Sequence, residues 1–176
     1  IICSHCETQL PFTHFSQMKH SPVEKIFWGR VSIEKAFSIL YFTKESIVQK
    51  IIFELKYKQN KKAAYLLGRL MAKDLISFQI NSPIDYMIPI PISKRKLRSR
   101  GFNQSKLLCE AMVRNGYNVP IMDGLVKSKE SLSQTKKDRL HRAENSKPVF
   151  QLNPIINLAN KHLLIVDDVL TTGATL

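Results

Sequence analysis

Three stretches of the chain place apolar residues at spacings of three and four, which is the pattern of an amphipathic helix. The first helix is predicted to follow Ser46, a residue type that caps helix N-termini, and to continue through Leu55. The second is predicted from about residue 62 to residue 77. The third is predicted to open at Asn103 and to close at Asn115–Gly116.

Short apolar runs between these helices predict strands. They lie at 36–42, at 86–92 with Pro89 and Pro91 near its end, at 125–126 and at 163–166. The last run is continuously apolar, a pattern typical of a strand buried on both faces of a parallel sheet. Because strands alternate with helices, the sequence predicts an α/β fold.

Two segments lack a clear period. Residues 7–32 are mixed and contain Pro11 and Pro22, which favours a small loop-rich module or a connector. Residues 127–147 are polar and basic, which predicts a long mobile loop. We therefore divide the chain into a partial metal-binding module with its connector at 1–32 and a main domain at 33–176. The chain starts without Met and stops directly after a glycine-threonine loop, so we expect a fragment truncated at both ends.

The composition is that of a globular protein. Of the 176 residues, 44% are hydrophobic, which excludes a wholly disordered chain. No apolar run approaches the roughly 20 residues that span a bilayer, and the first residues do not resemble a signal peptide. We therefore expect a soluble, cytoplasmic protein.

The charge is strongly positive, with 27 Lys and Arg against 14 Asp and Glu and a net charge of +13. Such a field attracts polyanions: nucleic acid, an anionic membrane surface or a phosphorylated small molecule. One basic cluster contains Lys94, Arg95, Lys96, Arg98 and Arg100, and the other contains Lys127, Lys129, Lys136, Lys137, Arg139, Arg142 and Lys147. Two basic loops beside apolar strands predict an anion site or a groove for a phosphate backbone. A solvated face is the alternative for the second cluster.

Cys3 and Cys6 form a CxxC pair near the N-terminus. This pair is half of a zinc site, a redox pair or two inert thiols, and we favour structural zinc. No βαβ unit surrounds the pair, which disfavours a thioredoxin-like site. Zinc needs two more ligands, and the nearby histidines do not have a convincing spacing; these are His5, His14 and His20. Cys109 stands alone in a helical pattern, where we expect a buried small hydrophobe.

The most informative segment is HLLIVDDVLTTGATL at 162–176. Its strand delivers Asp167 and Asp168 to a carboxyl end, where ligands bind in open α/β sheets. The loop that follows contains Thr171, Thr172, Gly173, Ala174 and Thr175, whose N–H and hydroxyl groups suit a phosphate. The two carboxylates suit sugar hydroxyls or a hydrated Mg²⁺. The segment thus predicts a sugar-phosphate site, the alternative being a capped helix in which the acids are turn residues.

The stretch LLIVDDVLTTGAT resembles the phosphoribosyl-pyrophosphate (PRPP) signature of type I phosphoribosyltransferases. Three further blocks, IPIPISKRKLRSRGFNQ, LKYKQNKKAAYLLGRLMA and SLSQTKKDRLHRAEN, resemble the ComF family of competence proteins. The resemblance covers nearly the whole chain. It implies a type I phosphoribosyltransferase fold with a central, mostly parallel sheet flanked by helices. It also implies a small N-terminal zinc-ribbon-like module, whose second CxxC pair we expect in a missing segment.

The resemblance also implies roles for individual residues. Asp167 and Asp168 would contact the ribose hydroxyls as the catalytic candidates, with Mg²⁺ accompanying PRPP, and the loop 171–175 would surround the 5′-phosphate. Pyrophosphate would lie on the segment 91–100. The candidates for pyrophosphate or nucleic acid are Lys94, Arg95, Arg98, Arg100, Lys136, Lys137, Arg139 and Arg142. The Zn²⁺ ligands would include Cys3 and Cys6.

The function that the resemblance implies is PRPP binding in natural competence, with uptake of single-stranded DNA and a partner in the DNA-uptake machinery at the inner membrane. The alternative is an active phosphoribosyltransferase of nucleotide or amine metabolism without a DNA role. A structural adaptor is a third interpretation. Tyr57, Phe102 and His141 sit beside basic residues and are candidates for stacking on bases, although ordinary packing also explains each of them.

Overall fold

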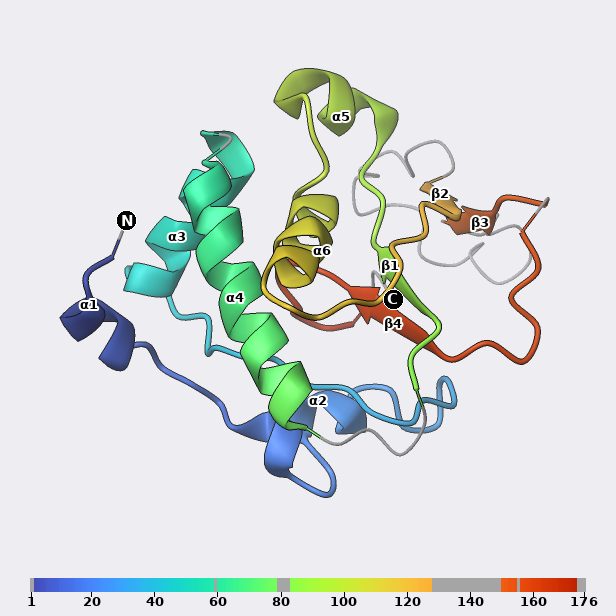
Figure 1. Cartoon of the computed structure of the whole chain (residues 1–176), viewed down its shortest axis with the longest axis horizontal. Helices are drawn as coiled ribbons and strands as arrows, with labels where there is room; N and C mark the ends of the chain where they lie inside the picture. The colour runs from blue at the N-terminus through green and yellow to red at the C-terminus, as the bar shows by residue number, and fades with distance from the viewer. Residues whose placement is uncertain (1, 59, 79–82, 128–149, 155, 174–176) are drawn as a thin grey trace, which may run out of the picture.

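A computed structural model describes residues 2–58, 60–78, 83–127, 150–154 and 156–173, and it shows an α/β protein (Figure 1). Its elements are α1 (Ser4–Thr8), η1 (Phe15–Gln17), α2 (Pro22–Lys25), α3 (Ile47–Tyr57), α4 (Lys61–Ser77), β1 (Tyr86–Pro89), α5 (Lys94–Arg100), α6 (Gln104–Arg114), β2 (Leu125–Lys127), β3 (Phe150–Leu152) and β4 (Leu163–Val166). Helices α3, α4 and α6 group beside the β1–β4 pair, and α5 projects above them.

Strands β1 and β4 are parallel neighbours, with Tyr86 opposite Leu163 and Pro89 opposite Val166. On the other side of β1, the Met87 N–H donates to the Pro120 carbonyl at 2.8 Å, where a single parallel bridge forms. β2 and β3 form a separate antiparallel pair. Because β1 and β4 run in the same direction, the segments that follow them emerge at one edge.

The core lies between the helices and β1. Its largest fully buried side chains include Leu55, Met87, Leu108 and Met112. Helices α4 and α6 approach each other at Gly68, where an added Cβ would lie 2.4 Å from Cβ of Ala111. This closeness explains a glycine inside a helix, a position at which glycine costs about 1 kcal/mol relative to alanine.

Gly68→Ala should therefore lower the free energy of unfolding, although alanine is the better helix former. Overpacking a core costs about 1–3 kcal/mol, and the gain in helix propensity offsets about 1 kcal/mol of that. Urea unfolding measures the difference. Lys62→Ala, an exposed change on the same helix, should be nearly neutral, and a Gly68→Ala variant more stable than the parent would contradict this packing.

The three predicted helices are confirmed, and so are the N-caps predicted for two of them. Ser46 Oγ accepts the Gln49 N–H at 3.1 Å, and Asn103 Oδ1 accepts the Ser105 N–H at 3.0 Å. The strand predicted at 86–92 exists as the shorter β1, because the next residues continue toward α5. The strands predicted at 125–126 and 163–166 are present as β2 and β4.

The strand predicted at 36–42 is wrong. The segment makes one antiparallel bridge, between Phe12 and Leu40, and no ladder. Its partner segment includes Pro11, which has no N–H to donate and so interrupts a ladder. The branched and aromatic residues of 36–42 instead pack against the core, as Phe37 and Ile39 do.

Two further predictions are corrected. The first basic cluster is not a loop but the helix α5, because Ser93 Oγ accepts the Lys96 N–H at 3.3 Å and Gly101, at φ 78°, ends the helix. β4 is not buried on both faces, because Ile165 is 49% exposed while Val166 is buried. The elements α1, η1, α2 and β3 were not predicted, and each has five residues or fewer.

Part of the predicted mobile loop at 127–147 lies outside the described residues, which omit 128–149. Within the described ranges, no helix combines the length and apolar character that crossing a bilayer requires.

Candidate functional site

The acids predicted to bind a ligand lie at the carboxyl end of β4. Asp167 follows Val166 directly, and the Val166 carbonyl accepts the Ile90 N–H at 3.0 Å, which keeps the chain after β1 alongside. The Asn103 side-chain amide donates to the Ile90 carbonyl at 3.0 Å. The sheet edge, the segment after β1 and the start of α6 therefore meet at the acids.

Asp167 is held by two hydrogen bonds. Its Oδ1 accepts the Ser105 hydroxyl at 3.1 Å and the Asp168 N–H at 2.8 Å. Ser105 is fully buried in the first turn of α6. Burial raises the pKa of the Asp167 carboxyl, and the two hydrogen bonds oppose that rise only in part. The fold thus holds a carboxyl where its charged form is disfavoured, an arrangement often found at functional sites.

Asp168 forms an ion pair with a residue of α3. Its Oδ2 lies 3.0 Å from Nζ of Lys56, and the two side chains are 5% and 23% exposed. The same Oδ2 is buried and accepts no well-aligned hydrogen bond in the described part of the chain. Buried carboxylate oxygens normally accept hydrogen bonds, so this one has acceptor capacity left for a sugar hydroxyl or a water bound to a cation.

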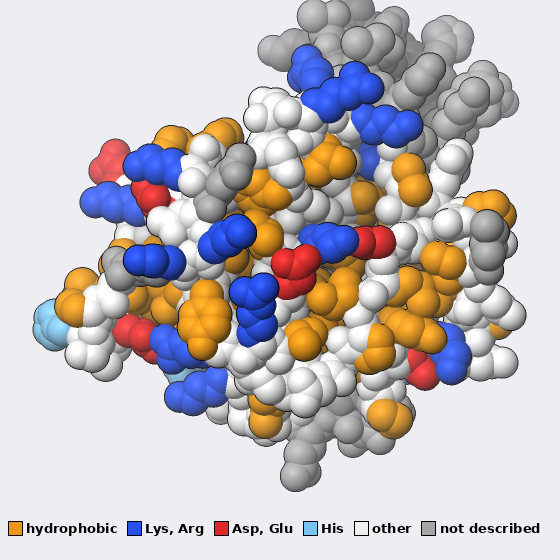
Figure 2. Space-filling model, turned by 45° about the horizontal axis from the view of Figure 1, so that its top comes forward, with side chains coloured by type: hydrophobic (Ala, Val, Ile, Leu, Met, Phe, Trp, Pro, Cys, Tyr) orange, Lys and Arg blue, Asp and Glu red, His pale blue; other side chains and the backbone are white. Residues whose placement is uncertain are grey.

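Helix α5 carries the first set of basic candidates, Lys94, Arg95, Arg98 and Arg100. Figure 2 shows Lys and Arg side chains gathered at the top of the view, where α5 projects. Arg100, at the end of α5, donates to Gln104 Oε1 at 3.2 Å, and its guanidinium carbon lies 5.3 Å from the ring centroid of Tyr57. Arg100 thereby links α5 to the C-terminal end of α3, beside the Lys56–Asp168 pair. The second set, Lys136, Lys137, Arg139 and Arg142, lies outside the described residues.

The predicted phosphate loop is described as far as residue 173. Thr171 and Thr172 are exposed, while Gly173 is buried with φ 68°, in the left-handed region that favours glycine. An added Cβ on Gly173 would lie 2.8 Å from Cγ2 of Ile26, so this glycine allows a close approach to the segment after α2. Ala174 and Thr175 lie outside the described residues.

The N-terminal segment packs behind this loop. Phe15, Val23 and Phe27 form a small buried cluster, against which Leu170 packs. Arg30 donates from Nη1 to the Thr172 carbonyl at 3.5 Å. The conformation of the loop therefore depends on contacts from residues 15–30 as well as on its own sequence.

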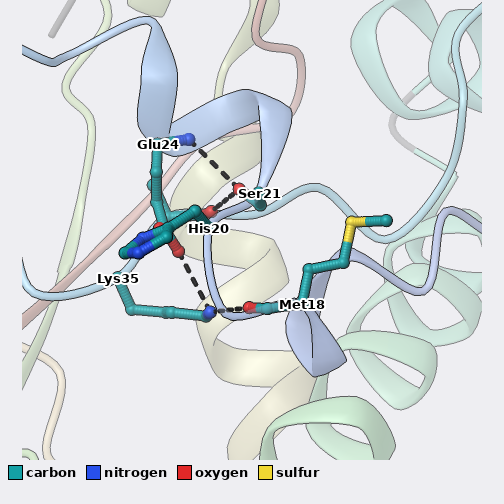
Figure 3. A network of polar contacts seen from close by, with 6 residues as sticks. Met18, His20, Ser21, Glu24 and Lys35 are labelled. Carbon is teal, nitrogen blue, oxygen red and sulfur yellow. Dashed lines mark hydrogen bonds and ion pairs between the residues drawn. The ribbon is translucent and has the colours of Figure 1, made fainter.

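A polar network fixes this segment (Figure 3). Glu24 is buried, and its Oε1 lies 3.1 Å from Nζ of Lys35, while its Oε2 lies 3.6 Å from Nδ1 of His20. Ser21 Oγ accepts the Glu24 N–H at 3.1 Å and caps α2, and Lys35 also donates to the Met18 carbonyl. The pairing offsets the cost of burying the Glu24 charge and orients α2 toward the loop.

Cys3 and Cys6 lie at the first turn of α1. The Cys3 Sγ accepts the Cys6 N–H at 3.5 Å, and this hydrogen bond lowers the pKa of the Cys3 thiol. A side-chain hydrogen bond with the Cys3 thiol, together with the negative charge of Cys3, raises the pKa of the Cys6 thiol. Two thiols supply half of a tetrahedral zinc site. Among the described residues, no group of three or more His, Cys, Asp or Glu side chains could hold a metal ion. Cys109 is fully buried, as predicted, and burial raises its pKa to about 12.

Sequence reasoning missed Lys56 and Ser105. Lys56 lies in a block that resembles the ComF family, and Ser105 directly follows another, but a lysine on an amphipathic helix and a serine in a first helical turn also fit a solvated face and a cap. Only the fold brings them to Asp168 and Asp167. The sequence does indicate that Lys56 can face inward, because this residue lies beside Leu55 on the apolar side of α3.

Comparison with known proteins gives relatives with consistent names. The chain is 26% identical over 180 residues to "Competence protein F" of Haemophilus influenzae, covering 99% of this chain and 74% of that protein. It is 28% identical over 128 residues to "DNA utilization protein YhgH" of Escherichia coli K12, covering 71% of this chain and 56% of that protein. It is 33% identical over 90 residues to "Competence protein ComFC" of Bacillus subtilis, covering 51% of this chain and 34% of that protein.

The match therefore spans only about half the length of YhgH. No family model matches the chain, and no solved structure matches it. The names of these relatives nevertheless agree, since each refers to competence or to DNA utilization. These relatives support the resemblance of the chain to the ComF family.

Proposed function

We propose that this chain binds PRPP together with Mg²⁺ at the carboxyl end of β4. The observation that carries the proposal is the pair of partly buried acids, Asp167 and Asp168, shortly before the loop that turns at Gly173. The acceptor capacity of Asp168 Oδ2 suits a ribose hydroxyl, and the exposed Thr171 and Thr172 suit a 5′-phosphate. Ala174 and Thr175 complete the proposed loop.

The proposed pyrophosphate subsite is the basic helix α5, with Lys94, Arg95, Arg98 and Arg100. α5 carries no acidic residue, so its charge favours a polyanion that enters beside the acids. Bound Mg²⁺ would neutralise part of the pyrophosphate charge. We propose a type I phosphoribosyltransferase fold for residues 33–176, which the parallel β1–β4 pair with the acids at its carboxyl end supports.

The wider proposal is a role in natural competence. In this role the chain handles incoming single-stranded DNA on the cytoplasmic side of the inner membrane. The DNA-uptake machinery would be its partner. The relatives' names and the net charge of +13 support it. Contacts with phosphates should make DNA affinity fall steeply with added salt, because each contact releases condensed counterions.

An active phosphoribosyltransferase is the second candidate function, favoured by the cationic helix α5, whose Arg100 contacts Tyr57 next to the Lys56 that pairs with Asp168. In that reaction a nitrogen nucleophile would form a bond to the ribose C1. The C1–oxygen bond would break, pyrophosphate would leave with the electron pair, and the proton of the nucleophile would pass to solvent. The cations of α5 would stabilise the charge that develops on the leaving group.

Titration of the chain with PRPP and Mg²⁺ tests the binding proposal. We expect heat in calorimetry and a rise in the melting temperature, with a smaller rise for ribose 5-phosphate. Neither heat nor a thermal shift with PRPP would overturn it. Pyrophosphate release, measured with purine, pyrimidine and amine acceptors, then separates the two candidate functions, since a chain that only binds PRPP releases none.

We also propose that Cys3 and Cys6 supply two thiolates to a Zn²⁺ site in an N-terminal zinc-ribbon-like module at 1–32. The lowered pKa of Cys3 favours the thiolate that zinc binds. Zinc content after exhaustive dialysis tests this proposal. Cys3→Ser and Cys6→Ser should lower it, and Cys109→Ser, at the buried third cysteine, should not. Equal zinc content in all variants would exclude these ligands.

A further inference from the structure

We propose that single-stranded nucleic acid stacks its bases on an aromatic platform formed by Phe53 and Tyr57 on the outer face of α3. The inference rests on the proposed role in DNA handling and gives it a location. Sequence reasoning named Tyr57, Phe102 and His141 as stacking candidates. In the structure Tyr57 is exposed, Phe102 is half-buried and His141 lies outside the described residues.

The two platform rings lie against each other and are open to solvent. Their centroids are 4.9 Å apart, with an angle of 40° between the ring planes. Phe53 is 51% exposed and Tyr57 is 61% exposed. An aromatic pair four residues apart stabilises a helix by only about 0.2–0.5 kcal/mol, which does not by itself account for leaving so much ring surface in water. A flat base stacked on the rings would cover that surface.

Positive charge surrounds the platform. The Arg100 guanidinium lies 5.3 Å from the Tyr57 ring centroid, and Lys50 is exposed about one turn before Phe53. Lys94, Arg95, Lys96 and Arg98 precede Arg100 on the same short helix. A strand with a base on Tyr57 could thus place its phosphates along α5. Rings that bind bases beside cations that bind phosphates form the usual surface for single strands.

The platform adjoins the proposed PRPP site through consecutive residues of α3. Lys56 reaches inward to Asp168, while Tyr57 faces Arg100 and solvent. A strand on the platform would therefore lie beside the proposed PRPP site rather than on a distant face.

This chemistry fits unpaired bases better than other polyanions. A duplex hides its base faces, and the headgroups of an anionic membrane offer no flat ring to stack on Phe53 and Tyr57. We therefore propose a single strand as the ligand. Binding to duplex DNA and to an anionic membrane is measured for comparison.

The test compares oligonucleotides with and without bases. Fluorescence anisotropy measures the affinity of the chain for labelled dT20 and for an abasic 20-mer with the same phosphates. Tyr57→Leu and Phe53→Leu should each weaken binding of dT20 about tenfold, the effect of losing one stacked base, and should leave the abasic oligomer nearly unchanged. Tyr65→Leu is the matched control, because Tyr65 is also exposed, at 48%, on the neighbouring helix α4.

Every result of this test either supports the stacking proposal or overturns it. If the parent chain does not bind dT20 at low salt, both the platform and the DNA role fail. If it binds but Tyr57→Leu and Phe53→Leu behave as Tyr65→Leu does, the DNA role stands and the platform is wrong. Equal losses for dT20 and the abasic oligomer would also overturn stacking, as would tighter binding to duplex DNA or to vesicles containing phosphatidylserine. Unchanged circular dichroism spectra and urea unfolding midpoints in the variants show that they remain folded.

Discussion

Replacing Lys56 with methionine should lower the free energy of unfolding by about 3 kcal/mol. The substitution removes the cation that lies 3.0 Å from the Asp168 carboxylate, whose side chain is 5% exposed. Removing one partner of a buried ion pair leaves an uncompensated charge in a poorly solvated site, at a cost of about 3–5 kcal/mol. We expect the lower end of this range, because Lys56 is 23% exposed and water can enter. Urea unfolding at neutral pH measures the loss.

Two further variants make this result specific. Lys58→Met removes a lysine two positions away, whose partner Glu54 is 34% exposed. A surface pair of that kind is worth about 0–1 kcal/mol, so the loss should be small. The double variant Lys56→Met with Asp168→Asn should recover most of the stability, because it also removes the stranded charge. If Lys56→Met were no more damaging than Lys58→Met, the ion pair would contribute little in solution.

The local part of the fold followed from the sequence because its signals are local. Ser46 and Asn103 cap helices whose apolar faces are evident from spacing alone. The same reasoning failed at 36–42, where branched residues suggested a strand although Pro11 in the opposing segment cannot complete a ladder. It also failed at α5, because a run of basic residues does not show that Ser93 caps a helix.

The acid pair was predicted from the sequence, but its partners were not. Asp167 and Asp168 were recognisable at the end of a strand, yet Ser105 and Lys56 lie 62 and 112 positions away from them and arrive through tertiary packing. The contact between Ile26 and Gly173 could not be predicted either, because the pattern at 7–32 does not indicate which element that segment covers. Periodicity predicts which side of an element is buried, but not which other element covers it.

Asp167→Asn should reduce PRPP affinity about a hundredfold while making the chain more stable at neutral pH. Hydrogen bonds from a ligand to a charged group contribute about 1.5–3 kcal/mol, and the amide retains the shape of the side chain but not its charge. Stability should rise because the pKa of Asp167 is raised in the folded state, mainly by burial, above its ordinary value of 3.8. At neutral pH the folded chain therefore carries a destabilising charge that asparagine lacks. The amide oxygen can still accept from Ser105 and from the Asp168 N–H.

The pH dependence of the stability gained by Asp167→Asn distinguishes removal of a buried charge from general repacking of the site. A carboxyl with a raised folded-state pKa binds its proton more readily in the folded chain than in the unfolded chain. Its penalty is therefore complete above the folded-state pKa, and it disappears as the pH falls toward 3.8. Urea unfolding at a series of pH values should show the advantage of Asp167→Asn shrinking on acidification, whereas Asp123→Asn, at a carboxylate 54% exposed, should show no such gain. A gain independent of pH would mean that burial of the Asp167 charge is not its source, and unchanged PRPP affinity would remove this acid from the proposed ribose site.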